Sequence, residues 1–191
     1  IKIGAVFGLV ASLLTVWTGD GSGYAIAQTQ PMKLAAVEGY YEGQNGAGLV
    51  AVGLLNPEKK TYDDGQDSFL FRIEIPKMLS LLAERKVDAF VPGIKNIIEG
   101  GYELKDGTKA LSAAEKIEKG KKAIAALATY RTAKKEGDEA AAKEAYTTLQ
   151  ENVPYFGYGY IKDVNQLVPN VPLNFYAFRV MVILGGYFIL F

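Results

Sequence analysis

The sequence predicts a mainly α protein in which two truncated transmembrane helices bracket a mostly helical loop region. Three observations predict this class. Apolar runs occupy residues 3–17 and 172–191 of the 191-residue chain. The residues between them are polar and recur mostly with helical periodicity. Lys+Arg and Asp+Glu are each 21, so no basic surface is expected to attract nucleic acid.

The first apolar run, residues 3–17, is interrupted only by Gly, Ser and Thr. A bilayer span needs about 20 residues, so we expect a truncated transmembrane helix over residues 1–18. Trp17 stands at the polar boundary, where aromatic anchors are common. The chain begins without methionine, and we expect its natural start upstream. Taken alone, Lys2, the short apolar core and the small residues 25–27 also fit a secretory signal peptide.

The last apolar run favours a second truncated transmembrane helix over residues 173–191, with a single charge at Arg179. A signal peptide does not explain this second run, so two neighbouring helices of a longer membrane protein account better for both ends. An arginine in such a helix is costly unless it reaches the interface or a counter-charge. Arg179 is therefore expected to snorkel to the interface or to be paired.

Residues 19–172 form the predicted loop region. Short elements bounded by Gly or Pro are expected in its first half. These are helices at residues 32–42, 76–82 and 94–98, a Gly-rich loop at 43–53, and extended segments at 50–55 and 69–75.

A helical hairpin at about residues 110–150 is the clearest local unit. Ser112 and Glu115 fit a capping box, and Gly137 and Asp138 break the helical pattern and start it again. Charged residues surround a thin apolar stripe, which is typical of a solvated lid. No chemistry is assigned to it.

Neither histidine nor cysteine occurs in the chain. This excludes disulfides, zinc–thiolate sites, iron–sulfur clusters, Ser-His-Asp triads and a histidine-ligated haem completed within the chain. Catalysis here would need carboxylates, Lys, Tyr or a ligand from outside. A self-sufficient enzyme is therefore not expected.

Two pairs of residues carry possible chemistry. Lys33 and Glu38 would lie about 140° apart on a helix, too far round for an i,i+4 ion pair. Their spacing alone indicates a surface pair with no mutual role. Met181, two residues after Arg179, would most simply fill a core.

Three motifs indicate that these residues have a functional role. They are GDGSGY at residues 19–24, QPMKLAAVEG at 30–39 and FRVM at 178–181. Together they resemble subunit I of the cytochrome bd quinol oxidases, in which such motifs bracket the quinol-binding loop between two membrane helices. The resemblance also covers residues 69–98, whereas no family motif falls between about residues 100 and 167.

The resemblance implies that Glu38 and Lys33 are catalytic residues. Oxidising a quinol removes two protons, so Glu38 would act as general base. Lys33 would orient the ring oxygen and stabilise negative charge. The segment with Asp20, Ser22 and Tyr24 is expected to be a turn that ends the first helix and shapes the approach to the quinol.

The resemblance further implies that Met181 is an axial ligand of the iron of a low-spin haem b and that Arg179 pairs with a haem propionate. A thioether opposite an imidazole suits electron transfer, and the imidazole must come from outside this chain. Other b and d haems of the intact enzyme would be bound elsewhere.

The predicted function is therefore part of a membrane-bound terminal oxidase. Quinol would be oxidised at the outer face of the bacterial inner membrane, the loop lying on the extracytoplasmic, periplasmic side. Electrons would pass through the low-spin haem to reduce oxygen to water, and the fragment alone would be inactive. Expected partners are quinol, membrane lipid, the remainder of subunit I and a second oxidase subunit.

Two alternatives come from other functional classes. The first is a two-helix membrane receptor with an extracytoplasmic helical sensor domain. The second is a secreted helical binding protein that remains after signal cleavage, which the terminal apolar helix disfavours. Histidines in further apolar helices upstream would separate the oxidase from the receptor.

Overall fold

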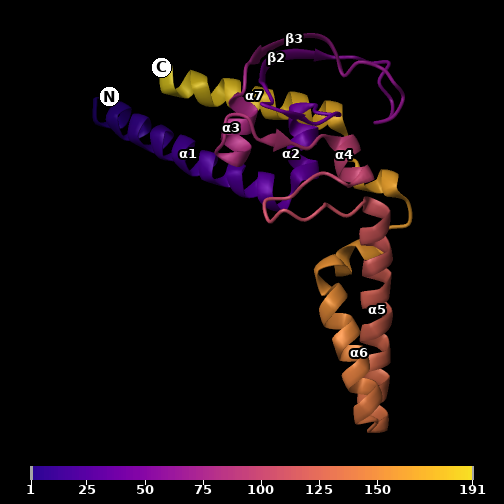
Figure 1. The fold of residues 1–191 in the computed structure, drawn as a ribbon. Coiled ribbons are helices and arrows are strands. Elements are labelled where there is room, and N and C mark those ends of the chain that lie inside the picture. Colours follow the sequence, from indigo (N-terminus) through magenta and orange to yellow (C-terminus); the bar gives the residue numbers. More distant parts are fainter. Residues whose placement is uncertain (1, 191) are drawn as a thin grey trace. The chain divides into compact units, whose positions relative to one another are not determined.

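A computed structural model describes residues 2–190 and divides the chain into two compact units. The first contains the chain up to Asn96 and from Val168 onward, and the second is Ile97–Leu167. Helices make up most of both units (Figure 1). The predicted mainly α class is confirmed.

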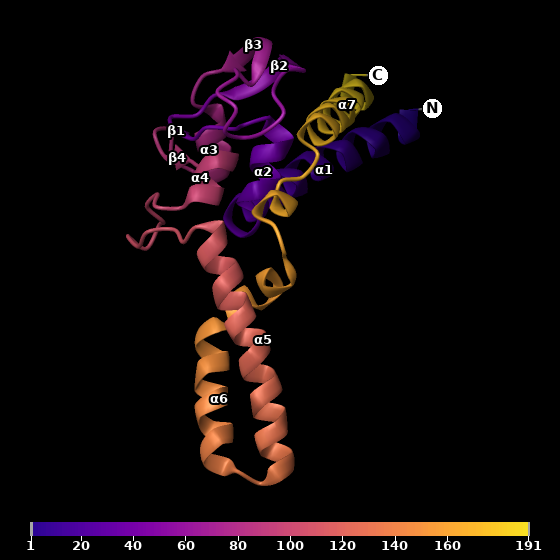
Figure 2. The same cartoon turned by 90° about the vertical axis from the view of Figure 1, so that its right-hand side faces the viewer.

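The long helices of the first unit are α1 (Lys2–Thr29) and α7 (Val171–Leu190). The first part of α1 and the last part of α7 lie at the same end of this unit (Figures 1 and 2). Their apolar side chains there are largely exposed, including Phe7, Trp17 and Ile183. Both helices are long and apolar enough to cross a membrane, judged by length and composition.

The remaining helices of this unit are α2 (Pro31–Glu38), α3 (Met78–Glu84) and α4 (Ile94–Glu99), at which the unit ends. Two antiparallel strand pairs accompany them. β2 (Leu49–Leu55) pairs with β3 (Phe69–Ile75), and β1 (Gln44–Asn45) pairs with β4 (Phe90–Val91). The two predicted extended segments are confirmed, and they form one hairpin.

α2 is a partly buried helix of the first unit. It packs against both α1 and α7, and Ala35 and Ala36 are only 2% and 0% exposed. Gly39 ends it with φ +65°, where side chains are unfavourable. A Cβ at Gly39 would lie 2.9 Å from Cζ of Phe69 and 3.2 Å from Cδ2 of Phe175. The helix therefore stops directly after Glu38, before the predicted end at residue 42.

α1 continues as a helix to Thr29, so the predicted turn at residues 19–24 is wrong. The polar side chains of this segment find partners without leaving the helix. The Ser22 hydroxyl donates to the Thr18 carbonyl at 2.9 Å, and the Asp20 carboxylate accepts hydrogen bonds from Arg85. Each glycine disfavours a helix by only about 1 kcal/mol relative to alanine. Packing of α1 against α2 and α3 outweighs that preference.

The second unit is the predicted hairpin, made of α5 (Ala113–Glu136) and α6 (Glu139–Asn152), followed by the 3₁₀ segments η1 (Val153–Tyr160) and η2 (Val164–Leu167). Figure 2 shows the two helices side by side. The capping box is confirmed, because Glu115 accepts from Ser112 N–H at 2.8 Å and donates its own N–H to the Ser112 hydroxyl at 3.2 Å. Gly137 ends α5 with φ +77°, and Asp138 caps α6.

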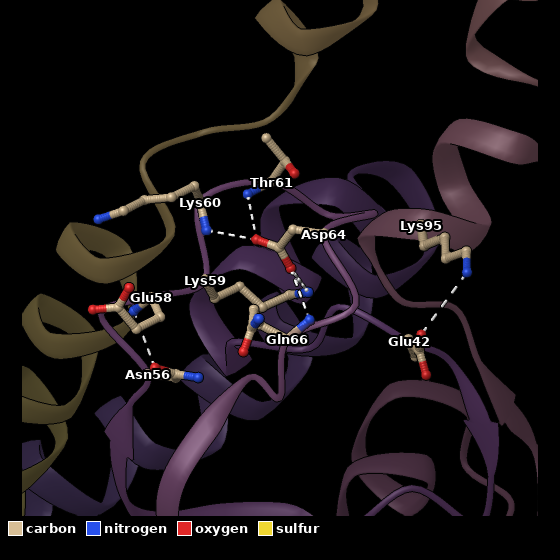
Figure 3. A network of polar contacts seen from close by, with 9 residues as sticks. All are labelled: Glu42, Asn56, Glu58, Lys59, Lys60, Thr61, Asp64, Gln66 and Lys95. Carbon is tan, nitrogen blue, oxygen red and sulfur yellow. Dashed lines mark hydrogen bonds and ion pairs between the residues drawn. The ribbon is translucent and has the colours of Figure 1, made fainter.

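The loop between β2 and β3, residues 56–68, is organised around Asp64 (Figure 3). Its carboxylate accepts hydrogen bonds from the Lys59 ammonium at 2.7 Å and from the backbone N–H groups of Lys60, Thr61 and Gln66 at 2.7, 2.9 and 3.1 Å. The Lys59 ammonium also lies 4.9 Å from the centre of the Tyr41 ring. Lys59 and these N–H groups hold the pKa of the Asp64 carboxyl well below its usual range.

Replacing Gly39 with alanine is expected to lower the melting temperature of the purified, detergent-solubilised protein. The positive φ costs about 1–2 kcal/mol, and overpacking against Phe69 and Phe175 adds roughly 1–3 kcal/mol. Gly65→Ala is the matched control, since Gly65 has φ +71° and a Cβ added there would meet nothing within 4 Å. An equal decrease in melting temperature in the two variants would show that the close contact at Gly39 does not contribute to stability.

Asp64→Asn is expected to reduce the protection of the amides of residues 60–66 at neutral pH, measured by hydrogen exchange and mass spectrometry. Because the folded pKa is depressed, the carboxylate stabilises the loop above its ordinary pKa of 3.8 and loses this effect as the pH falls below that value. The difference in amide protection between the parent protein and Asp64→Asn should therefore become smaller as the pH falls. Asp63→Asn, at an exposed neighbouring position, should leave the protection of these amides unchanged. Equal protection in all three proteins would contradict the proposed loop anchor.

Candidate functional site

An apolar cavity of about 440 Å³ lies within the first unit. Its walls come from α1, α2, α3, α7 and the β2–β3 hairpin. Most of its lining is apolar, including Leu34, Val50, Ile75, Leu79, Leu82 and Phe178. Its ionisable lining residues, within the described part of the chain, are Asp20, Tyr24, Glu38 and Arg179. A mostly apolar cavity with few polar groups is typical of a small-molecule site.

The central interaction of this cavity is a buried ion pair between Glu38 and Arg179. The Arg179 Nη2 lies 2.8 Å from the Glu38 Oε2, and the side chains are 12% and 4% exposed. The guanidinium also donates to the carbonyls of Val37 at 2.6 Å and Val50 at 2.9 Å. Its Cζ lies 3.8 Å from the centre of the Phe175 ring. One side chain of α7 thus joins α2 and β2.

Burial and charge act on Glu38 in opposite directions. Burial raises the pKa of the Glu38 carboxyl above its ordinary value, and the neighbouring Arg179 guanidinium opposes that rise. Breaking a buried ion pair by removing one partner typically costs about 3–5 kcal/mol, because the other charge stays buried and uncompensated. Removing either Glu38 or Arg179 is therefore expected to destabilise the folded first unit.

A second ion pair ties α3 to α1 beside the cavity. Arg85 donates to both carboxylate oxygens of Asp20, at 3.0 and 2.6 Å, and its guanidinium carbon lies 5.0 Å from the centre of the Tyr24 ring. The Gln28 side chain adds a hydrogen bond to the Ala83 carbonyl at 2.8 Å. Asp20 and Tyr24 thus shape this wall, although they do so from within a helix. Sequence reasoning missed Arg85, which belongs to no motif.

The four predicted site residues fall into different places. Glu38 and Arg179 meet in the cavity. Lys33 is exposed on α2 and does not line the cavity, and among residues 2–190 no ion pair joins it to Glu38. Met181 is 58% exposed and lies about 200° around α7 from Arg179, on the opposite side of the helix.

Sequence spacing could not reveal the Glu38–Arg179 pair, because the two residues are 141 positions apart. One signal was available: an arginine in an apolar helix requires a counter-charge. That rule demanded a partner for Arg179 but did not identify Glu38. Of the two expectations for Arg179 without the family, the structure shows pairing.

Potential ligands for a metal or cofactor are few. Within residues 2–190 no group of three or more His, Cys, Asp or Glu side chains lies together in a way that could hold a metal ion. Met181 offers a thioether on the exposed face of α7. A polar hollow of about 550 Å³, lined in part by Tyr41, Lys59 and Tyr62, contains none of the predicted site residues.

The chain is similar in sequence to subunit I of two cytochrome bd oxidases. A cytochrome bd-II ubiquinol oxidase subunit 1 of Escherichia coli (strain K12) is 31% identical over 206 residues, which is 98% of this chain and 35% of that protein. A Bacillus subtilis (strain 168) protein, provisionally named a cytochrome bd menaquinol oxidase subunit I, is 34% identical over 94 residues, 49% of this chain and 19% of that protein. The chain therefore spans about a third of the first relative's length and about a fifth of the second's.

The family model for cytochrome bd terminal oxidase subunit I matches residues 1–191. This match extends over both units, including the region in which no motif had been found. The chain belongs to the cytochrome bd terminal oxidase subunit I family.

Proposed function

We propose that this chain forms the quinol-oxidising part of a membrane-bound quinol:oxygen oxidoreductase. The observation that carries the proposal is a carboxylate, Glu38, that is 3% exposed in the wall of an apolar cavity. The cavity, of about 440 Å³, falls within the range of about 300–1,000 Å³ of ligand pockets. The named relatives are ubiquinol and menaquinol oxidases. Family membership favours this function over a receptor or a secreted binding protein.

Glu38 acts as the general base. A quinol loses two protons and two electrons to become a quinone, and a base must receive each proton as the ring is oxidised. Glu38 accepts a proton from a ring hydroxyl, releases it to water on the extracytoplasmic side, and then accepts the second proton. The apolar walls hold the ring.

Lys33 is the proposed orienting donor for the ring oxygen. Its ammonium would stabilise negative charge on that oxygen. Lys33 lies outside the cavity lining, so this role requires its flexible side chain to reach around α2.

Met181 is the proposed axial ligand of a low-spin haem b. Met181 is largely exposed on α7. Its thioether is the kind of ligand that such haems use opposite an imidazole. The chain contains no histidine, so the imidazole comes from elsewhere. When bound, the haem supplies a one-electron acceptor for the quinol. A contact of Arg179 with a haem propionate stays a prediction.

The intact protein is proposed to lie in the bacterial inner membrane, with α1 and α7 crossing it and the loop on the extracytoplasmic side. Quinol and lipid would reach the cavity there. The remainder of subunit I, a second oxidase subunit and further b and d haems would complete the reduction of oxygen to water.

Glu38→Ala in the full-length oxidase is expected to lower quinol turnover by at least about 10²-fold, because general-base catalysis contributes roughly 10²–10⁴-fold. Lys33→Ala is expected to lower it as well, and haem optical spectra should remain in both variants. Turnover is measured as quinol-dependent oxygen uptake. Glu58→Ala and Lys86→Ala, at exposed positions, are matched controls. Normal turnover in both site variants would remove the site assignment.

Met181→Leu in the same full-length protein is expected to abolish the reduced low-spin haem spectrum, because leucine offers no donor to iron. Optical difference spectra of reduced against oxidised enzyme measure this directly. Met32→Leu controls for the loss of a thioether elsewhere in the first unit. If the Met181→Leu spectrum matches that of the parent enzyme, the ligand is another residue.

A further inference from the structure

We infer that Arg179 is the positioning residue of the cavity, holding the Glu38 carboxylate ionised and fixed in orientation before it receives a proton. This inference rests on the proposed function and deepens it.

The guanidinium is fixed on several sides. Its Nη1 donates to the Val37 carbonyl at 2.6 Å, and its Nη2 donates to the Val50 carbonyl at 2.9 Å and to Glu38 at 2.8 Å. Phe175, which is 0% exposed, lies beneath it at 3.8 Å. Moving the guanidinium away would break all these contacts. Arg179 therefore presents a charge of fixed position to Glu38.

Arg179 is also the only cation that lines the cavity in the part of the chain that the structure describes. From α1, the ionisable lining residues are Asp20 and Tyr24, and Asp20 is paired with Arg85. The lining residues of α3 and of the hairpin carry no charge. Lys33, on α2 itself, is outside the lining. The ionised form of Glu38 thus depends on Arg179.

The pair leaves one carboxylate oxygen available. Arg179 contacts Oε2 of Glu38, and no hydrogen bond within residues 2–190 uses Oε1. Oε1 can therefore accept the hydrogen bond, and then the proton, of a quinol hydroxyl. Once Glu38 is protonated, Arg179 is left without its counter-charge, and this favours release of the proton before the next one arrives.

The test is the pH dependence of quinol oxidation by full-length Arg179→Gln oxidase. Without the guanidinium, the buried carboxylate should hold its proton to higher pH. The acid limb of the profile should move upward by at least about one pH unit, which is about a tenfold loss of activity on that limb. Activity should recover as the pH rises. Arg72→Gln, which removes the exposed Arg72–Glu74 pair, is the matched control and should leave the limb in place.

Infrared difference spectra of parent enzyme against Glu38→Gln give a second readout that does not need the Arg179 variant to assemble. The parent should show no protonated-carboxyl band from Glu38 at neutral pH and should gain one on acidification. In Arg179→Gln that band should already be present at neutral pH.

The outcomes separate this inference from the proposed function. Normal turnover in Glu38→Gln would overturn the general-base role itself. An inactive Glu38→Gln together with an unmoved acid limb in Arg179→Gln would overturn only the role of Arg179. A Glu38 that is already protonated at neutral pH in the parent enzyme would overturn it too, whether or not Arg179→Gln assembles.

Discussion

The structure of the first unit depends on a buried guanidinium that must be compensated. Arg179 is the single charged residue of α7, and a charge in such a helix is tolerated only with a partner. Glu38 supplies the counter-charge, and the carbonyls of Val37 and Val50 accept two further hydrogen bonds from the Nη groups. Because these acceptors come from α2 and β2, the requirements of a single side chain bring three elements together.

The sequence around Glu38 permits this close approach. Ala35 and Ala36 let α2 pack between the long helices, and Gly39 lets the chain turn where Phe69 and Phe175 leave no room for a side chain. The cavity follows from this packing, because its walls are the faces of α1, α3, α7 and the hairpin that surround the pair. Beside the cavity, Asp20 and Arg85 form a second ion pair, whose side chains are 40% and 43% exposed and thus screened by solvent.

In the proposed oxidase, α7 has a different role on each side. One side presents Arg179 to the proton-accepting carboxylate, and the other presents the Met181 thioether, the proposed haem ligand, two residues further along. The helix would thus separate the proton acceptor from the route taken by the electrons while keeping them about one helical diameter apart, roughly 10 Å. That arrangement suits a reaction in which one substrate releases both protons and electrons.

Features that arise from local interactions could be predicted from the amino-acid sequence. The terminal apolar runs predicted a truncated membrane helix at each end of the chain, whereas α1 and α7 are both long enough to cross a membrane. Ser112, Glu115 and Gly137 predicted the helical hairpin, since caps and helix breaks are set by near neighbours. The motifs around Glu38 and Met181 indicated the family. Three features follow from tertiary contacts instead: α1 continues through its glycines, Lys33 lies outside the cavity, and Glu38 pairs with Arg179. These depend on partners distant in sequence, such as Arg85 for Asp20, and no local pattern records which distant charge a buried side chain will meet.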